Sequence, residues 1–159
     1  MPNTKFLTMH WTYKNQEEFE IPEGSFGFIY RITDLETDRK YIGRKYLSRA
    51  KTVSKRVLKK DGTKVTKKKK SRVESEWQSY MGSCKPLLEE ISKKGKDKFK
   101  FEILAFANTK GQLSYLEEMY HFKLNCKVDD LYYNESVGPG RYRTLKISPE
   151  FIQLIQNCL

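Results

Sequence analysis

Two short apolar triplets near the start of the chain constrain its fold more than any other feature. Phe28-Ile29-Tyr30 and Tyr41-Ile42-Gly43 lie in two strand-like runs, residues 26–32 and 40–46, and a turn at residues 34–38 separates them. Such runs, bounded by turn residues, are typical of a β-hairpin. Tyr30 and Tyr41 would then lie on adjacent strands, where two phenol groups can point at one location.

The following segments predict a domain of the α+β class. Apolar and polar residues alternate over 99–105, which predicts a third strand. A helical pattern precedes it at 85–94, with Ser83 as the expected cap, and a second helical pattern follows at 110–124. This order predicts a small, mostly antiparallel three-stranded sheet flanked by helices.

The length of 159 residues predicts one folded domain with additions at its ends. The expected parts are an N-terminal extension at 1–25, a folded domain at 26–137 that includes a basic insertion at 48–73, and a tail at 138–159. A strand is expected around 5–13. The tail is expected to end in a short helix capped by Ser148, with Pro149 at its first position.

The charge of the chain predicts a polyanionic partner. Lys and Arg number 31 against 20 Asp and Glu, which gives a net charge of +11. A surplus of this size is typical of proteins that bind nucleic acid or a membrane surface. No apolar run approaches the roughly 20 residues of a membrane-spanning helix, and no amphipathic helix with a large apolar face favours membrane binding.

The basic insertion allows two interpretations. Lys67, Lys68, Lys69 and Lys70 cannot pack in a core, so the segment is either a solvated loop or an arm that contacts phosphates. Asp61-Gly62 is a turn signal within it, which favours a projecting hairpin.

Glu117 is a candidate metal ligand because of its place on the second predicted helix. At about 100° per residue, Leu113, Leu116 and Tyr120 gather on one face, and Glu117 falls at the edge of that face. Glu118 should point to solvent. One carboxylate with several waters and substrate phosphate oxygens is a reasonable Mg²⁺ site.

The motifs together resemble the GIY-YIG nuclease family. Phe28-Ile29-Tyr30 stands for the first triplet of the family and Tyr41-Ile42-Gly43 for the second. Glu117 follows on a predicted helix, and Asn134 follows later in Tyr132-Tyr133-Asn134. The region between the triplets and Glu117 is also similar to that of phage-borne and restriction-type members. The resemblance covers roughly residues 26–134. It implies a small antiparallel sheet with flanking helices, one divalent metal, Mg²⁺ or Mn²⁺, and cleavage of DNA.

The resemblance also implies roles for the site residues. Tyr30 would be the general base or would position the attacking water, Tyr41 would orient water or the phosphate, Glu117 would hold the metal, and Asn134 would brace the site. A tyrosine needs nearby cations to act as a phenolate, and Arg44 and Lys45 are near in sequence. The predicted DNA-binding residues are Arg44, Arg49, Lys67, Lys68, Lys69 and Lys70.

The chain departs from the family pattern at two points. Phe28 stands where glycine is usual, although Gly27 precedes it. The family's catalytic arginine cannot be placed cleanly, because the basic insertion intervenes. Arg72 is the first choice and Arg49 and Arg44 are alternatives, while Lys45 could share the task of stabilising the phosphate.

The expected function is therefore that of a metal-dependent DNA endonuclease acting on double-stranded DNA, homing-type ahead of restriction-type. The alternative is a catalytically inactive, basic nucleic-acid-binding module that retains the fold. A homodimer is left open. Three widely spaced cysteines without a metal-binding spacing predict reduced thiols and a cytoplasmic location, in a bacterial or phage-infected cell.

Overall fold

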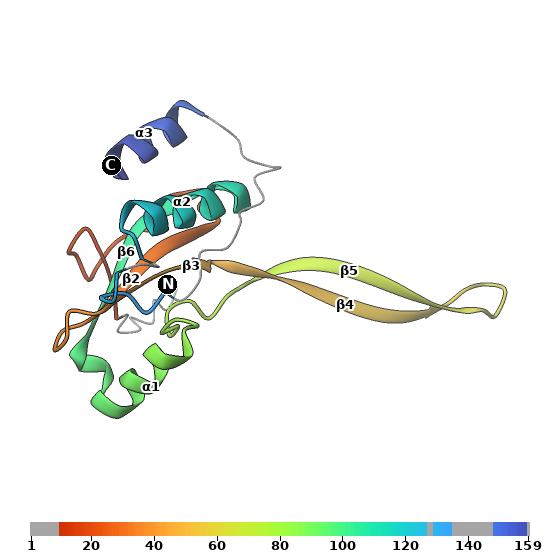
Figure 1. The fold of residues 1–159 in the computed structure, drawn as a ribbon. Helices are drawn as coiled ribbons and strands as arrows, with labels where there is room; N and C mark the ends of the chain where they lie inside the picture. Colours follow the sequence, from red (N-terminus) through yellow and green to blue (C-terminus); the bar gives the residue numbers. More distant parts are fainter. Residues whose placement is uncertain (1–9, 127–128, 135–147, 159) are drawn as a thin grey trace.

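The computed structural model describes residues 10–126, 129–134 and 148–158. Its elements, in chain order, are β1 (Trp11–Tyr13), β2 (Gly27–Asp34), β3 (Lys40–Tyr46), β4 (Ser48–Leu58), β5 (Lys64–Glu74), α1 (Lys85–Lys94), the 3₁₀ helix η1 (Lys96–Lys98), β6 (Phe99–Ala107), α2 (Lys110–Lys123) and α3 (Pro149–Cys158). The α+β class is as predicted (Figure 1).

The main sheet has four strands, in the order β1-β6-β2-β3. The pairings of β2 with β3 and with β6 are antiparallel, whereas β1 runs parallel to β6, with Trp11 opposite Phe101. The prediction of a three-stranded sheet is therefore wrong by one strand. Trp11 is fully buried, and burial of its large aromatic surface accounts for the docking of so short a strand.

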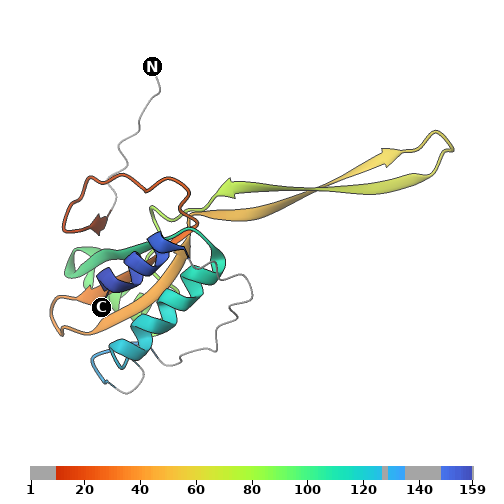
Figure 2. The ribbon, with the colours of Figure 1, turned by 90° about the horizontal axis from the view of Figure 1, so that it is seen from above.

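Helices cover both faces of this sheet (Figures 1 and 2). On one face, Phe28, Tyr30 and Ile32 of β2 pack with Leu87 and Ile91 of α1. On the other face, Ile29 and Ile42 pack with Leu113 and Leu116 of α2 and with Phe151 of α3. Because side chains alternate along β2, this strand contributes residues to two separate hydrophobic cores, one on each face of the sheet.

The helix ends agree with the predictions except at the start of α1. Cys84, not Ser83, occupies the cap position of α1, and its side chain makes no capping hydrogen bond. Pro86 in the first turn has no backbone N–H that would need an acceptor, so the helix can begin without a side-chain cap. The predicted cap of α3 is confirmed, because the Ser148 hydroxyl accepts a hydrogen bond from the Phe151 backbone N–H. Residues 138–147 of the predicted tail lie outside the described residues.

The outer edge of β3 is covered by a short segment near residue 132. The Lys40 backbone N–H donates to the Leu131 carbonyl at 2.7 Å, and the Tyr133 N–H donates to the Lys40 carbonyl at 2.8 Å. This pairing brings Asn134 beside the middle of β3, a long way from its place in the sequence.

The basic insertion forms a two-stranded antiparallel hairpin, β4 and β5, that projects from the body (Figures 1 and 2). The hairpin prediction is confirmed, and its turn is closed by a hydrogen bond from Lys59 N–H to the Thr63 carbonyl at 2.9 Å. Gly62 has a φ of 82° there, a conformation that favours glycine. Among the described residues, no helix is both long and apolar enough to cross a membrane.

Candidate active site

The two predicted tyrosines meet above a glycine in the β2–β3 hairpin. Tyr30 is paired in register with Gly43, and the ring centroids of Tyr30 and Tyr41 lie 6.0 Å apart. A Cβ atom added to Gly43 would lie 2.5 Å from the Tyr30 hydroxyl oxygen and 2.9 Å from Cε1 of Tyr41. The glycine therefore leaves the space in which both phenols lie against β3.

Both phenols are protonated at neutral pH. Burial raises the pKa of Tyr30 well above its ordinary value, and the neighbouring phenols of Tyr80 and Tyr41 and the carboxylate of Glu117 raise it further. Burial likewise raises the pKa of Tyr41, although a hydrogen bond with Ser83 opposes it. This is opposite to the shift that nearby cations were expected to produce: burial is the largest cause of both shifts, and the charged neighbour that contributes to each pKa is the Glu117 carboxylate, not a cation.

Tyr80 is a member of this cluster that the sequence reasoning missed. The Tyr30 hydroxyl donates to the Tyr80 hydroxyl at 3.4 Å, and the Lys45 ammonium lies 3.9 Å from the centre of the Tyr80 ring. Burial also lowers the pKa of Lys45. A Tyr at the end of a polar turn gives no sequence signal of its own, so only the fold reveals its place beside Tyr30.

Glu117 reaches β3 from α2, as its place on the helix predicts. Its Oε2 lies 3.2 Å from Nε of Arg44, and 21% of its side chain is exposed. Nη1 of Arg44 also donates to the Ser114 hydroxyl. Burial raises the pKa of Glu117, against the opposing effects of Arg44 and His121. The carboxylate is therefore half-buried, paired with a cation and still accessible to solvent.

Asn134 binds the strand that carries the other site residues. Its Oδ1 accepts a hydrogen bond from the Ile42 backbone N–H at 3.0 Å, and its Nδ2 donates to the Ile42 carbonyl at 2.8 Å. Nδ2 also lies 3.2 Å from Nε2 of the buried His121. The side-chain amide of Asn134 thus makes the two backbone hydrogen bonds with Ile42 that a neighbouring strand would otherwise make at this edge of β3.

Four consecutive residues of β3 therefore organise the cluster. Tyr41 supplies a phenol, Ile42 is held by Asn134, Gly43 lies under both tyrosines, and Arg44 pairs with Glu117. Because side chains alternate along a strand, Tyr41 and Arg44 leave β3 on opposite faces.

The other predicted basic residues lie on or near the hairpin. Nη2 of Arg72 donates to the Ser48 hydroxyl at 2.7 Å, and its guanidinium lies 4.8 Å from the centre of the Phe26 ring. These contacts hold Arg72 at the base of the hairpin. Arg49, Lys67, Lys68, Lys69 and Lys70 are exposed along β4 and β5. Of the three candidate arginines, Arg44 is the one that pairs with Glu117.

Comparison with known proteins identifies the family of this arrangement. Residues 11–137 match the family model described as "Putative endonuclease segE, GIY-YIG domain". The chain belongs to the GIY-YIG nuclease family. The matched region of this GIY-YIG chain begins at β1 and includes the hairpin, both tyrosines, Glu117 and Asn134. No curated protein and no solved structure matches the chain.

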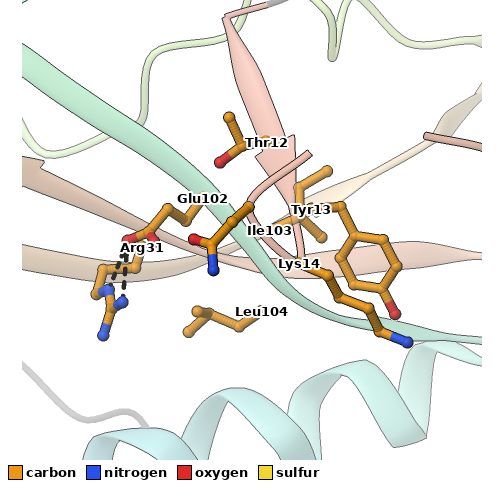
Figure 3. Close-up of a pocket in the computed structure, with 8 residues that line it drawn as sticks. Thr12, Tyr13, Lys14, Arg31, Glu102, Ile103 and Leu104 are labelled. Atoms are coloured by element: carbon orange, nitrogen blue, oxygen red, sulfur yellow. Dashed lines mark hydrogen bonds and ion pairs between the residues drawn. The ribbon is translucent and has the colours of Figure 1, made fainter. Parts of the chain in front are cut away.

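A hollow elsewhere on the GIY-YIG domain is a poor candidate for its chemistry. It lies where β1, β6 and β2 meet, and its lining includes Thr12, Lys14 and Leu104 (Figure 3). Two of its charged side chains already bind each other, since Nη2 of Arg31 lies 2.9 Å from Oε2 of Glu102. Tyr30, Tyr41, Tyr80, Glu117 and Asn134 are not among the residues that line this hollow.

The donor set of the GIY-YIG site fits a hydrated divalent cation better than a fully protein-bound one. Among the described residues, no group of three or more His, Cys, Asp and Glu side chains gathers where it could hold a metal ion. Glu117 would therefore be the protein ligand, with water and phosphate oxygens completing the shell. Mg²⁺ commonly binds through one or two carboxylates plus substrate phosphate.

Proposed function

We propose that the protein is a metal-dependent endonuclease that hydrolyses phosphodiester bonds of double-stranded DNA. The observation that carries this proposal is the arrangement of side chains around the middle of β3: two phenols lie against Gly43 on one face, Arg44 pairs with Glu117 from the other face, and Asn134 holds Ile42 at the strand edge. Membership of an endonuclease family supports a DNA substrate.

Each of these residues would have a different role in hydrolysis. A water oxygen must form a bond to phosphorus as the bond to the leaving oxygen breaks, and the negative charge on the phosphate must be balanced. Because Tyr30 and Tyr41 are protonated, they are suited to orient the water and the phosphate by hydrogen bonds. A divalent cation at Glu117 would supply positive charge at the phosphate and at the leaving oxygen.

Arg44 is the arginine that the geometry favours for the phosphate. Its guanidinium already lies at Glu117, where a cation-bound phosphate would be placed, and its planar donors can form paired hydrogen bonds to phosphate oxygens. Arg72 remains the second candidate, at the base of the hairpin. The conservative variants Arg44→Lys and Arg72→Lys distinguish the two, because the catalytic arginine loses its forked geometry while keeping its charge.

The test is cleavage of supercoiled plasmid with Mg²⁺ and with EDTA. We expect wild-type protein to nick or linearise the plasmid only with the metal, and Glu117→Gln and Tyr30→Phe to lower the rate by orders of magnitude while DNA affinity changes little. Glu118→Gln is the matched control, because it removes the same charge from the next position of α2. Discrete fragments would support a homing- or restriction-type specificity.

Two outcomes would contradict the proposal. Cleavage that persists in EDTA or in Glu117→Gln would remove the metal role of this carboxylate. A folded wild-type protein that shifts DNA on a gel but never cuts it would favour the inactive binding module instead.

A further inference from the structure

The positive charge of the chain is concentrated on the hairpin. The arm, defined as β4, β5 and their turn at residues 48–74, contains twelve Lys and Arg residues against two acidic ones. It therefore carries +10 of the chain's net charge of +11, and the remaining residues are close to neutral. Any strong attraction to a polyanion must come from the arm.

The register of the arm divides its basic residues equally between two faces. Cross-strand partners share a face, and successive residues alternate between faces. Lys55 is opposite Lys67, and Lys68 is opposite Ser54. The first face carries Arg49, Lys51, Lys55, Lys67 and Lys69, and the second face carries Arg56, Lys64, Lys68, Lys70 and Arg72.

Both faces are open to solvent along most of the arm. Residues 49–56 and 66–72 are all exposed, and in both views of the ribbon no other helix or strand of the described residues lies beside the arm beyond its base (Figures 1 and 2). A ribbon that lies flat on one surface can use only one of its faces. Equal charge on two opposite faces instead suits a site with phosphates on both sides.

The grooves of a DNA duplex offer such a site. The major groove is about 12 Å wide, admits a two-stranded β-ribbon, and has a phosphate backbone along each side. Each strand of the arm has 11 residues, which at about 3.4 Å per residue is close to the length of one turn of duplex. The deep, narrow major groove of A-form RNA does not admit side chains in this way.

The arm also contains a repulsion that phosphates on both sides would relieve. Lys55 and Lys67 are directly opposite each other, and like charges in that position destabilise a hairpin. A two-stranded ribbon without a packed face is only marginally stable in water. Counter-charges along both faces would therefore order the arm as well as bind it.

We propose that the arm inserts into the major groove of double-stranded DNA, with its two basic faces contacting the two phosphate backbones. This proposal rests on the proposed function in taking DNA as the substrate. It goes further in assigning a separate DNA strand to each face of the arm.

Two double variants of the same strand test the assignment. Lys67→Gln/Lys69→Gln neutralises two positions of the first face, and Lys68→Gln/Lys70→Gln neutralises two positions of the second face at nearly the same distance from the body. Binding of each protein to a 30-base-pair duplex is measured over a range of salt in EDTA. Each phosphate contact contributes about 0.9 to the slope of log affinity against log salt, so each double variant should lose about 2.

Methylation by dimethyl sulfate then reports the groove. Bound wild-type protein should protect guanine N7, a major-groove atom, and leave adenine N3 in the minor groove reactive. Amide hydrogen exchange in β4 and β5 of both double variants, compared with wild type, confirms that the hairpin persists in them.

The outcomes separate this proposal from the proposed function. Equal losses of slope in the two double variants with guanine N7 protection support insertion into the major groove. A loss in one double variant alone, or protection of adenine N3 in place of guanine N7, overturns it while leaving the nuclease intact. Wild-type protein that binds no duplex at all overturns both proposals.

Discussion

Gly43 is important for the site because it has no side chain. Its φ lies outside the left-handed region, since it is absent from the glycines with positive φ, so alanine would fit the backbone there. The added Cβ, however, would lie 2.6 Å from Cζ of Tyr30 as well as 2.5 Å from its hydroxyl oxygen. The space over β3 is therefore reserved for the tyrosine rings.

The Gly43→Ala variant is expected to lose cleavage without losing DNA binding. Both rings must move by about 1 Å, and a displacement of that size can lower a rate by about 100-fold. DNA affinity should not change, because the arm that carries nearly all of the net charge, residues 48–74, does not include Gly43. Plasmid cleavage and gel-shift assays on the same preparation measure the two effects. Full activity in Gly43→Ala would show that the tyrosine arrangement is not required.

Asn134 is expected to contribute to stability as well as to the site. Asn134→Ala leaves the backbone N–H of Ile42 without its side-chain partner and removes one of two partners from its carbonyl, which also lies 3.2 Å from Nε2 of His121. An unpaired buried polar group costs about 1–3 kcal/mol. We therefore expect a lower urea midpoint and faster amide exchange at Ile42. Asn108→Ala, at an exposed position, is the control. An unchanged exchange rate at Ile42 would rule out the bracing role.

At the scale of elements, a buried ion pair joins the β2–β3 turn to α1. Nζ of Lys94 lies 2.6 Å from Oδ2 of Asp34, whose side chain is fully buried, and Oδ1 of Asp34 accepts the Glu36 backbone N–H at 2.9 Å. Burial alone would raise the pKa of Asp34, but the hydrogen bonds from Lys94 and from the turn outweigh it and lower the pKa below its ordinary value.

This ion pair predicts a loss of stability in acid. Because the pKa of Asp34 is lower in the folded chain than in the unfolded chain, the carboxylate stabilises the fold at neutral pH and loses this contribution as the pH falls below about 4. Asp34→Asn should therefore lower the melting temperature at pH 7 and approach wild type near pH 3. Lys94→Met should be more damaging at pH 7, because it leaves a buried carboxylate without its cation. A pH-independent difference between wild type and Asp34→Asn would contradict this account.

The elements also show which parts of the fold a sequence can specify. Periodicity predicts β2, β3, β6 and both main helices, because each pattern is local. It does not predict the parallel pairing of β1 with β6, since alternation marks a strand but not its partner. Within the site, Tyr30 and Tyr41 are on one local hairpin and Glu117 is fixed by helix geometry, so their positions could be anticipated. The Arg44–Glu117 pair and Tyr80 depend on contacts distant in sequence, and only the fold supplies them.

At the scale of the whole molecule, charge and core are separated in space. The arm holds nearly all of the net charge, whereas the two hydrophobic clusters of the body contain no residue between 48 and 74. The body should therefore fold and position its site without the arm, while the arm should supply most of the attraction to DNA. Binding and catalysis would then be separable by a single deletion.

The deletion replaces residues 50–72 by Asn-Gly, which can join the paired residues Arg49 and Val73 as a two-residue hairpin turn. We expect the melting temperature to change little, because neither hydrophobic cluster loses a residue, although the contact of Arg72 with Phe26 is removed. KM for plasmid should rise by orders of magnitude and lose most of its salt dependence, because the phosphate contacts of the arm are gone. The metal-dependent kcat at low salt should remain, since Tyr30, Tyr41, Glu117 and Asn134 are untouched. A variant that stays folded but loses kcat together with affinity would show that the arm also completes the catalytic site, and would move Arg72 ahead of Arg44 as the catalytic arginine.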